Sequence, residues 1–283
     1  MVKFDLLPPC KQSPINLTPF ANWRSVEGEV LVEFYRTVEG YTIRFLGCAD
    51  FLLPPQANWV IALPEPGTLE QAVKDLYYYQ ILPMICGQRG DLVIHASGVA
   101  APSGALGFVA STGRGKSTLA AGFARSGVPF LSDDGLTLVR EGKKYTAHAN
   151  RPSFRLWHDS EAALGLRNAE RNPAGGKVRI GAAPTLPFHD ATVPLCALYF
   201  LGAGQTAITS IEPLSKQRAM AALINHSFLL DVTMEKRLRL HFEQLGELAE
   251  TVPCYTLDYP REYAALSLVI DTVLQHAFES GQR

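Results

Sequence analysis

The stretch from Ala105 to Val139 contains a glycine-rich run that fits one local structure. Small residues and two glycines separate a short apolar segment, 106–109, from an amphipathic segment, 117–125, that stops near Gly127. This pattern favours an apolar strand, a tight loop and a helix. We therefore expect a strand–loop–helix unit whose loop holds an anionic ligand at the start of the helix.

The loop matches the phosphate-loop pattern. Its residues are Ala110, Ser111, Thr112, Gly113, Arg114, Gly115, Lys116 and Ser117, with alanine at a position more often held by glycine. Small residues let successive backbone N–H groups turn toward phosphate oxygens, a lysine reaches the β- and γ-phosphates, and a hydroxyl binds Mg²⁺. We predict that residues 111–118, ending with Thr118, bind ATP and that Ser117 is a ligand of Mg²⁺. The alternative is a glycine-rich turn that binds nothing.

Two further features lie near this loop in the sequence. Asp133 and Asp134 follow the apolar run 128–131. Carboxylates at a strand end beside a phosphate loop hold Mg²⁺ or accept a proton from an attacking hydroxyl. The alternative is a turn, because Gly135 completes an Asp-Asp-Gly hairpin sequence. His95 ends another apolar run. Its role there is to neutralise the charge that develops on the phosphoryl group, to orient a carboxylate, or to pack as a structural residue of the core.

Composition excludes several classes of protein. The chain has 283 residues, 26 Lys+Arg and 27 Asp+Glu, so a polybasic binder of nucleic acid or of a membrane surface is not expected. Its five cysteines show no CxxC pair or metal-binding spacing, which predicts reduced thiols. There is no signal-peptide pattern, and no run approaches the roughly 18 apolar residues of a membrane span. We expect a cytoplasmic location.

The order of the elements predicts an α/β protein with two parts. Residues 1–88 read as a β-rich unit, with strands in 29–37, 41–53 and 59–65 and one helix whose capping box is Thr68 with Gln71. Pro83 predicts a kink in that helix or an early end. Residues 89–283 read as a core with C-terminal helices. Its expected elements are strands in 91–101, 105–111, 128–139, 145–157, 194–201 and 208–214, helices in 117–125 and 161–166, a mobile loop over 172–187, and mostly helix from Lys216 onward.

The runs IHASGV, ASTGRGKST and LSDDGLTLV, followed by YTAHANRPSFRLW, resemble the nucleotide-binding core of the HPr kinase/phosphorylase superfamily. They are more particularly similar to the HPr-kinase-like proteins that include lasso-peptide kinases. The resemblance covers residues 91–157. It implies a kinase core related to phosphoenolpyruvate carboxykinase, with a mixed sheet in place of the usual parallel one.

The same resemblance implies roles for individual residues. Lys116 would hold the β- and γ-phosphates of ATP, and Ser117 would bind Mg²⁺. Asp134, alone or with Asp133, would activate the acceptor hydroxyl, with His95 close by. Which aspartate is the base and which serves the metal stays open at this point, although Asp133 is the candidate metal ligand.

The chain departs from the family at its C-terminal side. The RGxGxxN signature of HPr kinases does not follow Trp157, so HPr as substrate, the phosphorylase activity and the family's hexamer have no support from the sequence. Arg151 and Arg155, and also Lys177 and Arg179, are candidate contacts for a phosphate or an acidic peptide. The alternative is that these are solvated loop charges.

Together these observations predict an Mg²⁺-ATP-dependent kinase. Its acceptor would be a serine or threonine hydroxyl on a small protein or a ribosomal peptide precursor. A kinase for a small-molecule hydroxyl and a nucleotide-sensing module without turnover are the two alternatives. We expect no nucleic-acid or membrane partner, and a homo-oligomer remains open.

Overall fold

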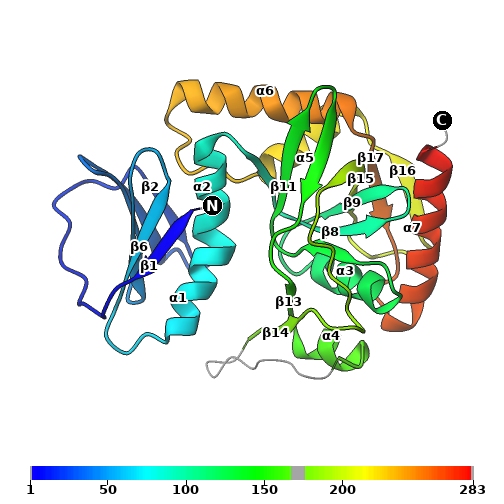
Figure 1. The fold of residues 1–283 in the computed structure, drawn as a ribbon, viewed down its shortest axis with the longest axis horizontal. Helices are drawn as coiled ribbons and strands as arrows, with labels where there is room; N and C mark the ends of the chain where they lie inside the picture. Colours follow the sequence, from blue (N-terminus) through cyan, green and yellow to red (C-terminus); the bar gives the residue numbers. More distant parts are fainter. Residues whose placement is uncertain (1, 167–175, 282–283) are drawn as a thin grey trace. The chain divides into compact units, whose positions relative to one another are not determined.

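The computed structural model describes residues 2–166 and 176–281. It divides into two compact units (Figure 1). Unit 1 comprises Met1–Gly90 and Leu229–Arg239, and unit 2 comprises Asp91–Phe228 and Leu240–Arg283. The chain therefore comes back to unit 1 late in its course, which the sequence analysis did not predict.

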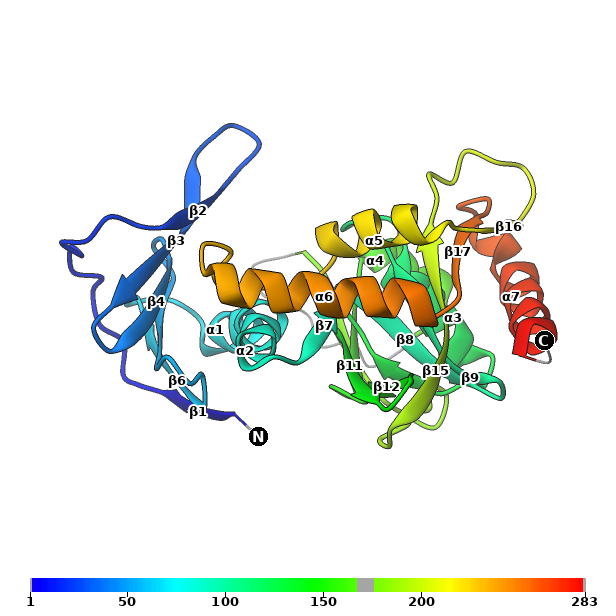
Figure 2. The same cartoon turned by 90° about the horizontal axis from the view of Figure 1, so that it is seen from above.

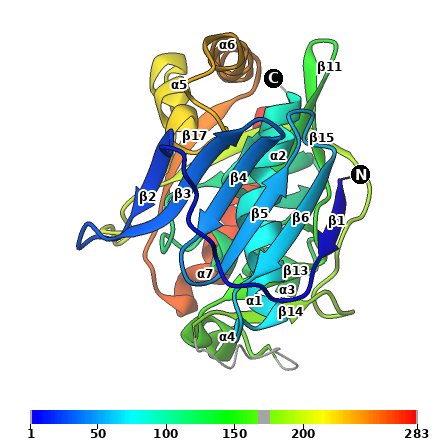
Figure 3. The ribbon, with the colours of Figure 1, turned by 90° about the vertical axis from the view of Figure 1, so that its left-hand side faces the viewer.

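Unit 1 is built on one sheet (Figure 3). Its strands are β1 (Lys3–Leu6), β2 (Ala21–Arg24), β3 (Val30–Thr37), β4 (Gly40–Phe45), β5 (Ala49–Leu53) and β6 (Trp59–Pro64), in the spatial order β1-β6-β5-β4-β3-β2. The pair β1–β6 is parallel and the other pairs are antiparallel. The predicted strand 41–53 is two strands, because the chain turns at Gly47, where φ is 66°. The two edge strands have four residues each, too few for a periodic pattern to reveal them.

The helical part of unit 1 contains a π-helical turn. It runs through α1 (Glu70–Leu76), the π turn (Tyr77–Ile81) and α2 (Leu82–Arg89), and ends at Gly90 with φ 99°. Pro83 lies in the first turn of α2, directly after the π turn. The predicted capping box is wrong, since the Thr68 hydroxyl donates to the carbonyl oxygen of Cys48 at 3.0 Å and no side chain caps α1.

The late segment 229–239 is tied to unit 1 through one carboxylate. Asp231 is fully buried and accepts hydrogen bonds from Arg36 Nε at 2.7 Å, Arg36 Nη2 at 2.8 Å and Tyr41 Oη at 3.1 Å. The Thr233 backbone and hydroxyl donate to the same carboxylate. A contact between residues 195 apart in the sequence thus holds the segment in place.

Unit 2 is a mixed α/β structure around a second sheet. Its strands are β7 (Leu92–Ile94), β8 (Ala96–Ala101), β9 (Gly104–Val109), β10 (Phe130–Ser132), β11 (Leu136–Glu141), β12 (Lys144–His148), β15 (Val193–Leu201), β16 (Ser210–Pro213) and β17 (Cys254–Asp258). The order is β10-β8-β9-β15-β12-β11-β7, and β17 lies between β15 and β16. β9, β15 and β17 are parallel, whereas the other pairs are antiparallel. The expected mixed sheet is confirmed.

Helices cover both faces of this sheet (Figures 1 and 2). On one face, α3 (Lys116–Arg125) and α7 (Leu266–Gly281), which follows a 3-10 turn (Tyr263–Ala265), pack their apolar side chains around Phe108 and Tyr199. On the other face, α5 (Lys216–Asn225) and the unit 2 part of α6 (Glu235–Thr251) pack around Val109 and Leu198. Neighbouring strand residues thus serve opposite cores, as the period of a strand requires.

Several elements of unit 2 differ from the prediction. The run 91–101 is broken at His95 into β7 and β8, and 145–157 holds β12 and a separate β13 (Ser153–Leu156). The helix expected at 161–166 is α4 (His158–Ala163), and β17 was missed within a region expected to be mostly helical. The expected mobile loop includes β14 (Val178–Gly181), which pairs with β13, while its residues 172–175 lie outside the described part.

The cysteines and the apolar helices were also subjects of the sequence prediction. The five cysteines are free thiols, as predicted, although Cys10 is exposed and only Cys254 is buried. Among the described residues, no helix has the length and apolar character needed to cross a membrane.

Candidate functional site

The carboxyl ends of four strands meet at one edge of the unit 2 sheet. β9, β15 and β17 are parallel neighbours. β10 is antiparallel to β8, and β8 is antiparallel to β9, so β10 points the same way as β9. Ligands of α/β proteins bind outside such strand ends. The glycine-rich loop follows β9, the acidic pair follows β10, and the loops after β15 and β17 lie on the other side of β9.

The loop after β9 has the backbone that its glycines permit. Gly113 and Gly115 have φ of 83° and 84°, in the left-handed region, and α3 begins directly afterwards at Lys116. Lys116 is buried, and its Nζ donates to the carbonyl oxygen of Ala110 at 2.7 Å. Burial lowers the pKa of Lys116, and the charges of Asp134 and Asp133 oppose that shift. The ammonium is therefore held inside the loop, within the field of the acidic pair.

Asp133 lies behind the site. It is 5% exposed, and its two carboxylate oxygens accept from Ser97 Oγ at 2.7 Å and from the backbone N–H of Arg155 at 2.9 Å. Burial and the neighbouring Asp134 raise its pKa, although hydrogen bonds from Arg155, Ser97 and Ser117 act in the opposite direction. The side chain links the strand β8, the helix start and β13 to one another.

Asp134 faces the pocket. Its φ of 61° is unusual for a residue with a side chain, and His95 Nε2 lies 3.7 Å from its carboxylate. Burial raises the pKa of Asp134, but the nearby His95 and the charges of Lys177 and Lys116 outweigh burial and lower the pKa to about 2. The carboxylate is ionised at neutral pH.

The Asp-Asp-Gly sequence does not form a hairpin. β10 pairs with β8, whereas β11 pairs with β12 and β7, so the two strands flanking Asp133 and Asp134 do not pair with each other. The left-handed Asp134 therefore redirects the chain between separated places in the sheet.

A second histidine lies beside His95. The His95 backbone N–H donates to the carbonyl oxygen of His226 at 2.6 Å, and the two rings are 6.3 Å apart. Burial, together with the charges of His95 and Lys116, lowers the pKa of His226 to about 4. The sequence did not point to His226, because this residue follows α5, far along the chain from the other site residues.

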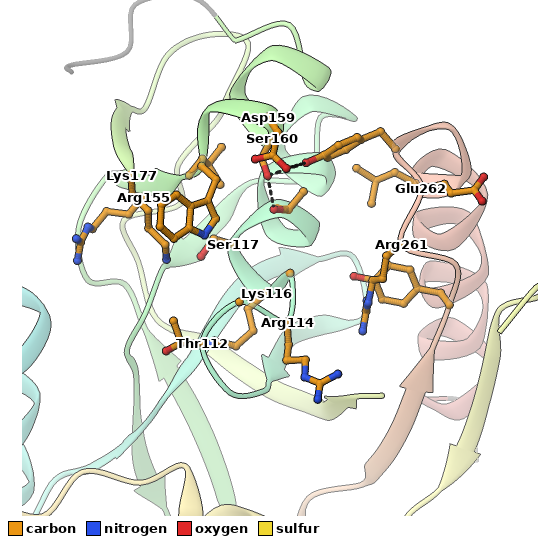
Figure 4. A pocket seen from close by; sticks show the side chains of 18 of the residues that line it. Thr112, Arg114, Lys116, Ser117, Arg155, Asp159, Ser160, Lys177, Arg261 and Glu262 are labelled. Carbon is orange, nitrogen blue, oxygen red and sulfur yellow. Dashed lines mark hydrogen bonds between the residues drawn. The ribbon is translucent and has the colours of Figure 1, made fainter. Parts of the chain in front are cut away.

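A pocket of about 320 Å³ lies at this edge of the sheet (Figure 4). Segment 112–118 forms its floor, residues from 155 to 160 and Lys177 form one side, and 259–263 with Ala203 form another. Every predicted ATP-binding residue except Ser111 lines it, as does Asp134. His95 and Asp133 stand behind that lining.

Basic side chains flank the pocket on two sides. Figure 4 shows Arg155 and Lys177 on one side of Lys116 and Arg261 on the other. Of the four basic residues downstream of the loop that were predicted contacts, Arg155 and Lys177 line the pocket, and Arg151 and Arg179 are not among its lining residues.

The donors available for a metal are oxygen atoms. Within 2–166 and 176–281, no group of three or more His, Cys, Asp or Glu side chains is placed to hold a metal ion. Mg²⁺ needs fewer protein ligands than that, because it keeps several waters and takes oxygens from phosphates. The Ser117 hydroxyl and the Asp134 carboxylate both line the pocket and are donors of the kind that Mg²⁺ prefers.

One wall of the pocket was not predicted from the sequence. Trp157, Tyr259, Arg261 and Tyr263 line it but had no predicted role. Three of them follow β17, and recognising Cys254–Asp258 as a strand would have placed them at its carboxyl end. That strand has only five residues and no clear alternation, so the signal was weak.

Comparisons with known proteins find a distant likeness. No family model matches the sequence, and no curated protein matches it. Among solved structures, the chain is similar to the Hpr(Ser) kinase/phosphatase from Coxiella burnetii, with 10% identity and a TM-score of 0.35. The match covers 66% of this chain and 97% of that one.

Proposed function

We propose that the protein is an Mg²⁺-ATP-dependent kinase that transfers the γ-phosphoryl group to a serine or threonine hydroxyl of a small protein or a ribosomally made peptide. The observation that carries the proposal is that Lys116, Ser117 and Asp134 line one pocket, at the end of a strand–loop–helix unit. A phosphate cradle, a lysine and an ionised carboxylate are the groups that phosphoryl transfer needs.

The phosphates of ATP would lie on the loop 112–117. Backbone N–H groups and the start of α3 favour anions there. In the free protein, Lys116 Nζ donates to the Ala110 carbonyl oxygen. On binding, this ammonium would exchange the carbonyl for phosphate oxygens, a stronger partner because both groups are then charged.

Magnesium fits beside Ser117. The Ser117 hydroxyl would bind the ion, and Asp133, which hydrogen-bonds to Ser117, would hold that hydroxyl from behind. When bound, Mg²⁺ supplies positive charge to the phosphate oxygens.

Asp134 would bind the acceptor hydroxyl. Because its pKa is about 2, it is ionised at neutral pH, so it accepts the hydrogen bond of the hydroxyl, orients its oxygen toward the γ-phosphorus and can take its proton. The new bond joins that oxygen to phosphorus as the bond to the leaving oxygen of ADP breaks. The proton passes to Asp134 late in the step, as a loose transition state allows. His95, 3.7 Å away, orients the carboxylate.

The acceptor would approach from the side of Arg155 and Lys177. Both side chains line the pocket near Asp134, and the charge of Lys177 is felt by that carboxylate. Cationic side chains at the entrance favour an acceptor with acidic groups near its hydroxyl. A peptide or small protein provides such groups more readily than a simple alcohol does.

Intact-mass spectrometry tests the proposal. The protein would be incubated with Mg²⁺-ATP and, separately, HPr or a lasso precursor peptide ending in serine. We expect one phosphoryl group on one acceptor with the unsubstituted protein and with Lys143→Ala, a control at an exposed lysine, and none with Lys116→Ala. Nucleotide bound without any phosphorylated acceptor would favour a small-molecule kinase or a nucleotide sensor. Full ATP affinity in Lys116→Ala would remove the phosphate-loop assignment.

A further inference from the structure

The sheet order gives the pocket two unlike ends. The acidic pair follows β10, on one side of β9, and the loops that follow β15 and β17 lie on the other side. If the γ-phosphate points toward Asp134, the rest of a nucleotide on the loop after β9 must extend toward the β15 and β17 side. On that side, the nucleotide would meet the pocket wall formed by Tyr259, Arg261 and Tyr263.

Tyr259 brings this wall against the glycine-rich loop. It directly follows β17, and its ring is buried. A Cβ atom built on Gly115 would lie 3.5 Å from the Tyr259 hydroxyl oxygen. The aromatic ring therefore stands next to the start of α3, where the phosphates would end and the nucleoside would begin.

Arg261 stacks on that ring. Its Cζ lies 3.8 Å from the centroid of the Tyr259 ring, and its Nη2 donates to the Gly202 carbonyl oxygen at 2.8 Å. Gly204 leaves room for it, since a Cβ atom there would overlap Arg261 Cγ. The Tyr259 ring, the Gly202 carbonyl and the close backbone at Gly204 thus fix the position of the guanidinium.

The hydrogen bonding of Arg261 is incomplete. Its Nη1 atom is buried and has no hydrogen-bond partner among the residues that the structure describes. A buried donor without a partner costs free energy. What the guanidinium offers a ligand is therefore its planar, positively charged face, beside the pocket that Arg261 lines.

The opposite side of this end is also ordered. Ser160 Oγ lies 2.9 Å from Thr118 Oγ1 and 3.1 Å from Tyr263 Oη, and Tyr263 Oη donates to Asp159 at 2.9 Å. Figure 4 shows Asp159 and Ser160 on one side of the opening and Arg261 on another. This row connects the first turn of α3 to the loop after β17, so both sides of the opening are fixed.

We propose that this end of the pocket is a nucleoside subsite in which the base of the nucleotide stacks on the Arg261 guanidinium backed by Tyr259. The inference rests on the proposed function, because it takes the phosphates to lie on the loop after β9. Arginine and aromatic rings bind bases by stacking on the π face, which every base has. Arg261 is thus a binding residue for the base rather than for phosphate.

Calorimetric titration in Mg²⁺ with three probes tests the subsite. The probes are ATP, ribose 5′-triphosphate, which has no base, and inorganic tripolyphosphate, which has no nucleoside. The unsubstituted protein is expected to bind ATP about tenfold more tightly than ribose 5′-triphosphate, the size of one stacking contact. This comparison needs no variant and so does not depend on how a substitution folds.

Arg261→Lys keeps the positive charge and removes the planar guanidinium group. We expect Arg261→Lys to remove most of the preference for ATP over ribose 5′-triphosphate. Its affinity for tripolyphosphate should stay within about twofold of that of the unsubstituted protein, which would also show that the loop is intact. Arg140→Lys, at an exposed arginine that pairs with Glu247, is the matched control.

Three results would overturn the inference while leaving the kinase proposal intact. These are equal affinity of the unsubstituted protein for ATP and ribose 5′-triphosphate, an equal loss for ATP and tripolyphosphate in Arg261→Lys, and unchanged ATP preference in that variant. If the unsubstituted protein binds none of the three probes, the proposed function itself fails.

Discussion

Asp133 and Asp134 are neighbours in the chain, yet their carboxylates have opposite surroundings. Asp133 is buried and fully engaged by Ser97 and the Arg155 backbone, and its pKa is raised. Asp134 lines the pocket beside His95, and its pKa falls to about 2. The left-handed backbone of Asp134 turns the two side chains apart. The pair therefore divides into a supporting residue and a residue that faces reactants.

The raised pKa of Asp133 leads to a prediction about stability. A carboxyl group whose pKa is higher in the folded state than in the unfolded chain lowers stability at every pH above its unfolded-state pKa, pH 7 included. Asp133→Asn removes the charge, and its amide can accept from the Arg155 N–H and donate to Ser97 Oγ. We expect a Tm at pH 7 equal to or above that of the unsubstituted protein. Asp133→Ala should lower stability by about 2 kcal/mol, because the donors on Ser97, Ser117 and the Arg155 backbone lose their acceptor. A Tm for Asp133→Asn as low as for Asp133→Ala would contradict this account.

Asp134→Asn should separate binding from transfer. The amide keeps the shape of the side chain but cannot take the proton of the acceptor hydroxyl. We expect kcat to fall by about 10²- to 10⁴-fold, the range for loss of a general base, with ATP affinity changed by less than about threefold. Steady-state kinetics and calorimetric titration measure the two quantities. Asp190→Asn, at an exposed aspartate, is the control, and survival of transfer in Asp134→Asn would place the base elsewhere.

Local signals in the sequence predicted the centre of the site. Glycines at 113 and 115 need left-handed backbone, and the apolar periods on either side are those of β9 and α3. These signals span a few residues, which is why a single sequence reveals them. The roles of Asp133 and Asp134 stayed open because the φ of Asp134 and the partners of Asp133 depend on distant strands.

The other features of the fold and the site depend on tertiary contacts, which the sequence does not show. The Thr68 hydroxyl has the right spacing for a helix cap but bonds to the carbonyl oxygen of Cys48 instead. β17 is short, and its place beside β15 is set by a pairing across more than 50 residues of chain. The pocket wall that contains Arg261 depends on that pairing, so no local sequence pattern predicts this wall. Tertiary context overrides propensity in each of these cases.

Asp231 should matter for unit 1 more than its place in the sequence implies. It is fully buried, and Arg36, Tyr41 and Thr233 all donate to it. Asp231→Ala leaves these donors without their acceptor, so we expect the free energy of unfolding to fall by about 3 kcal/mol in urea titrations.

Asp5→Ala is the matched control for that change. Asp5 also forms an ion pair in unit 1, with Lys3 at 2.9 Å, but both side chains are exposed. Its removal should cost less than about 1 kcal/mol. Similar losses for the two variants would show that the Asp231 network does not hold the segment 229–239.

His226 predicts how stability depends on pH. Its pKa is about 4 in the folded protein and, at the ordinary value, 6.5 in the unfolded chain. Between those values the unfolded state binds more protons, so stability falls as the pH is lowered from about 6.5 to about 4. His226→Gln removes this contribution, and its Tm should therefore fall less steeply than that of the unsubstituted protein over the same range. His241, whose pKa is also lowered by burial, keeps its share of the slope in both proteins. A slope in His226→Gln equal to that of the unsubstituted protein would mean that His226 is not held neutral by its burial beside His95 and Lys116.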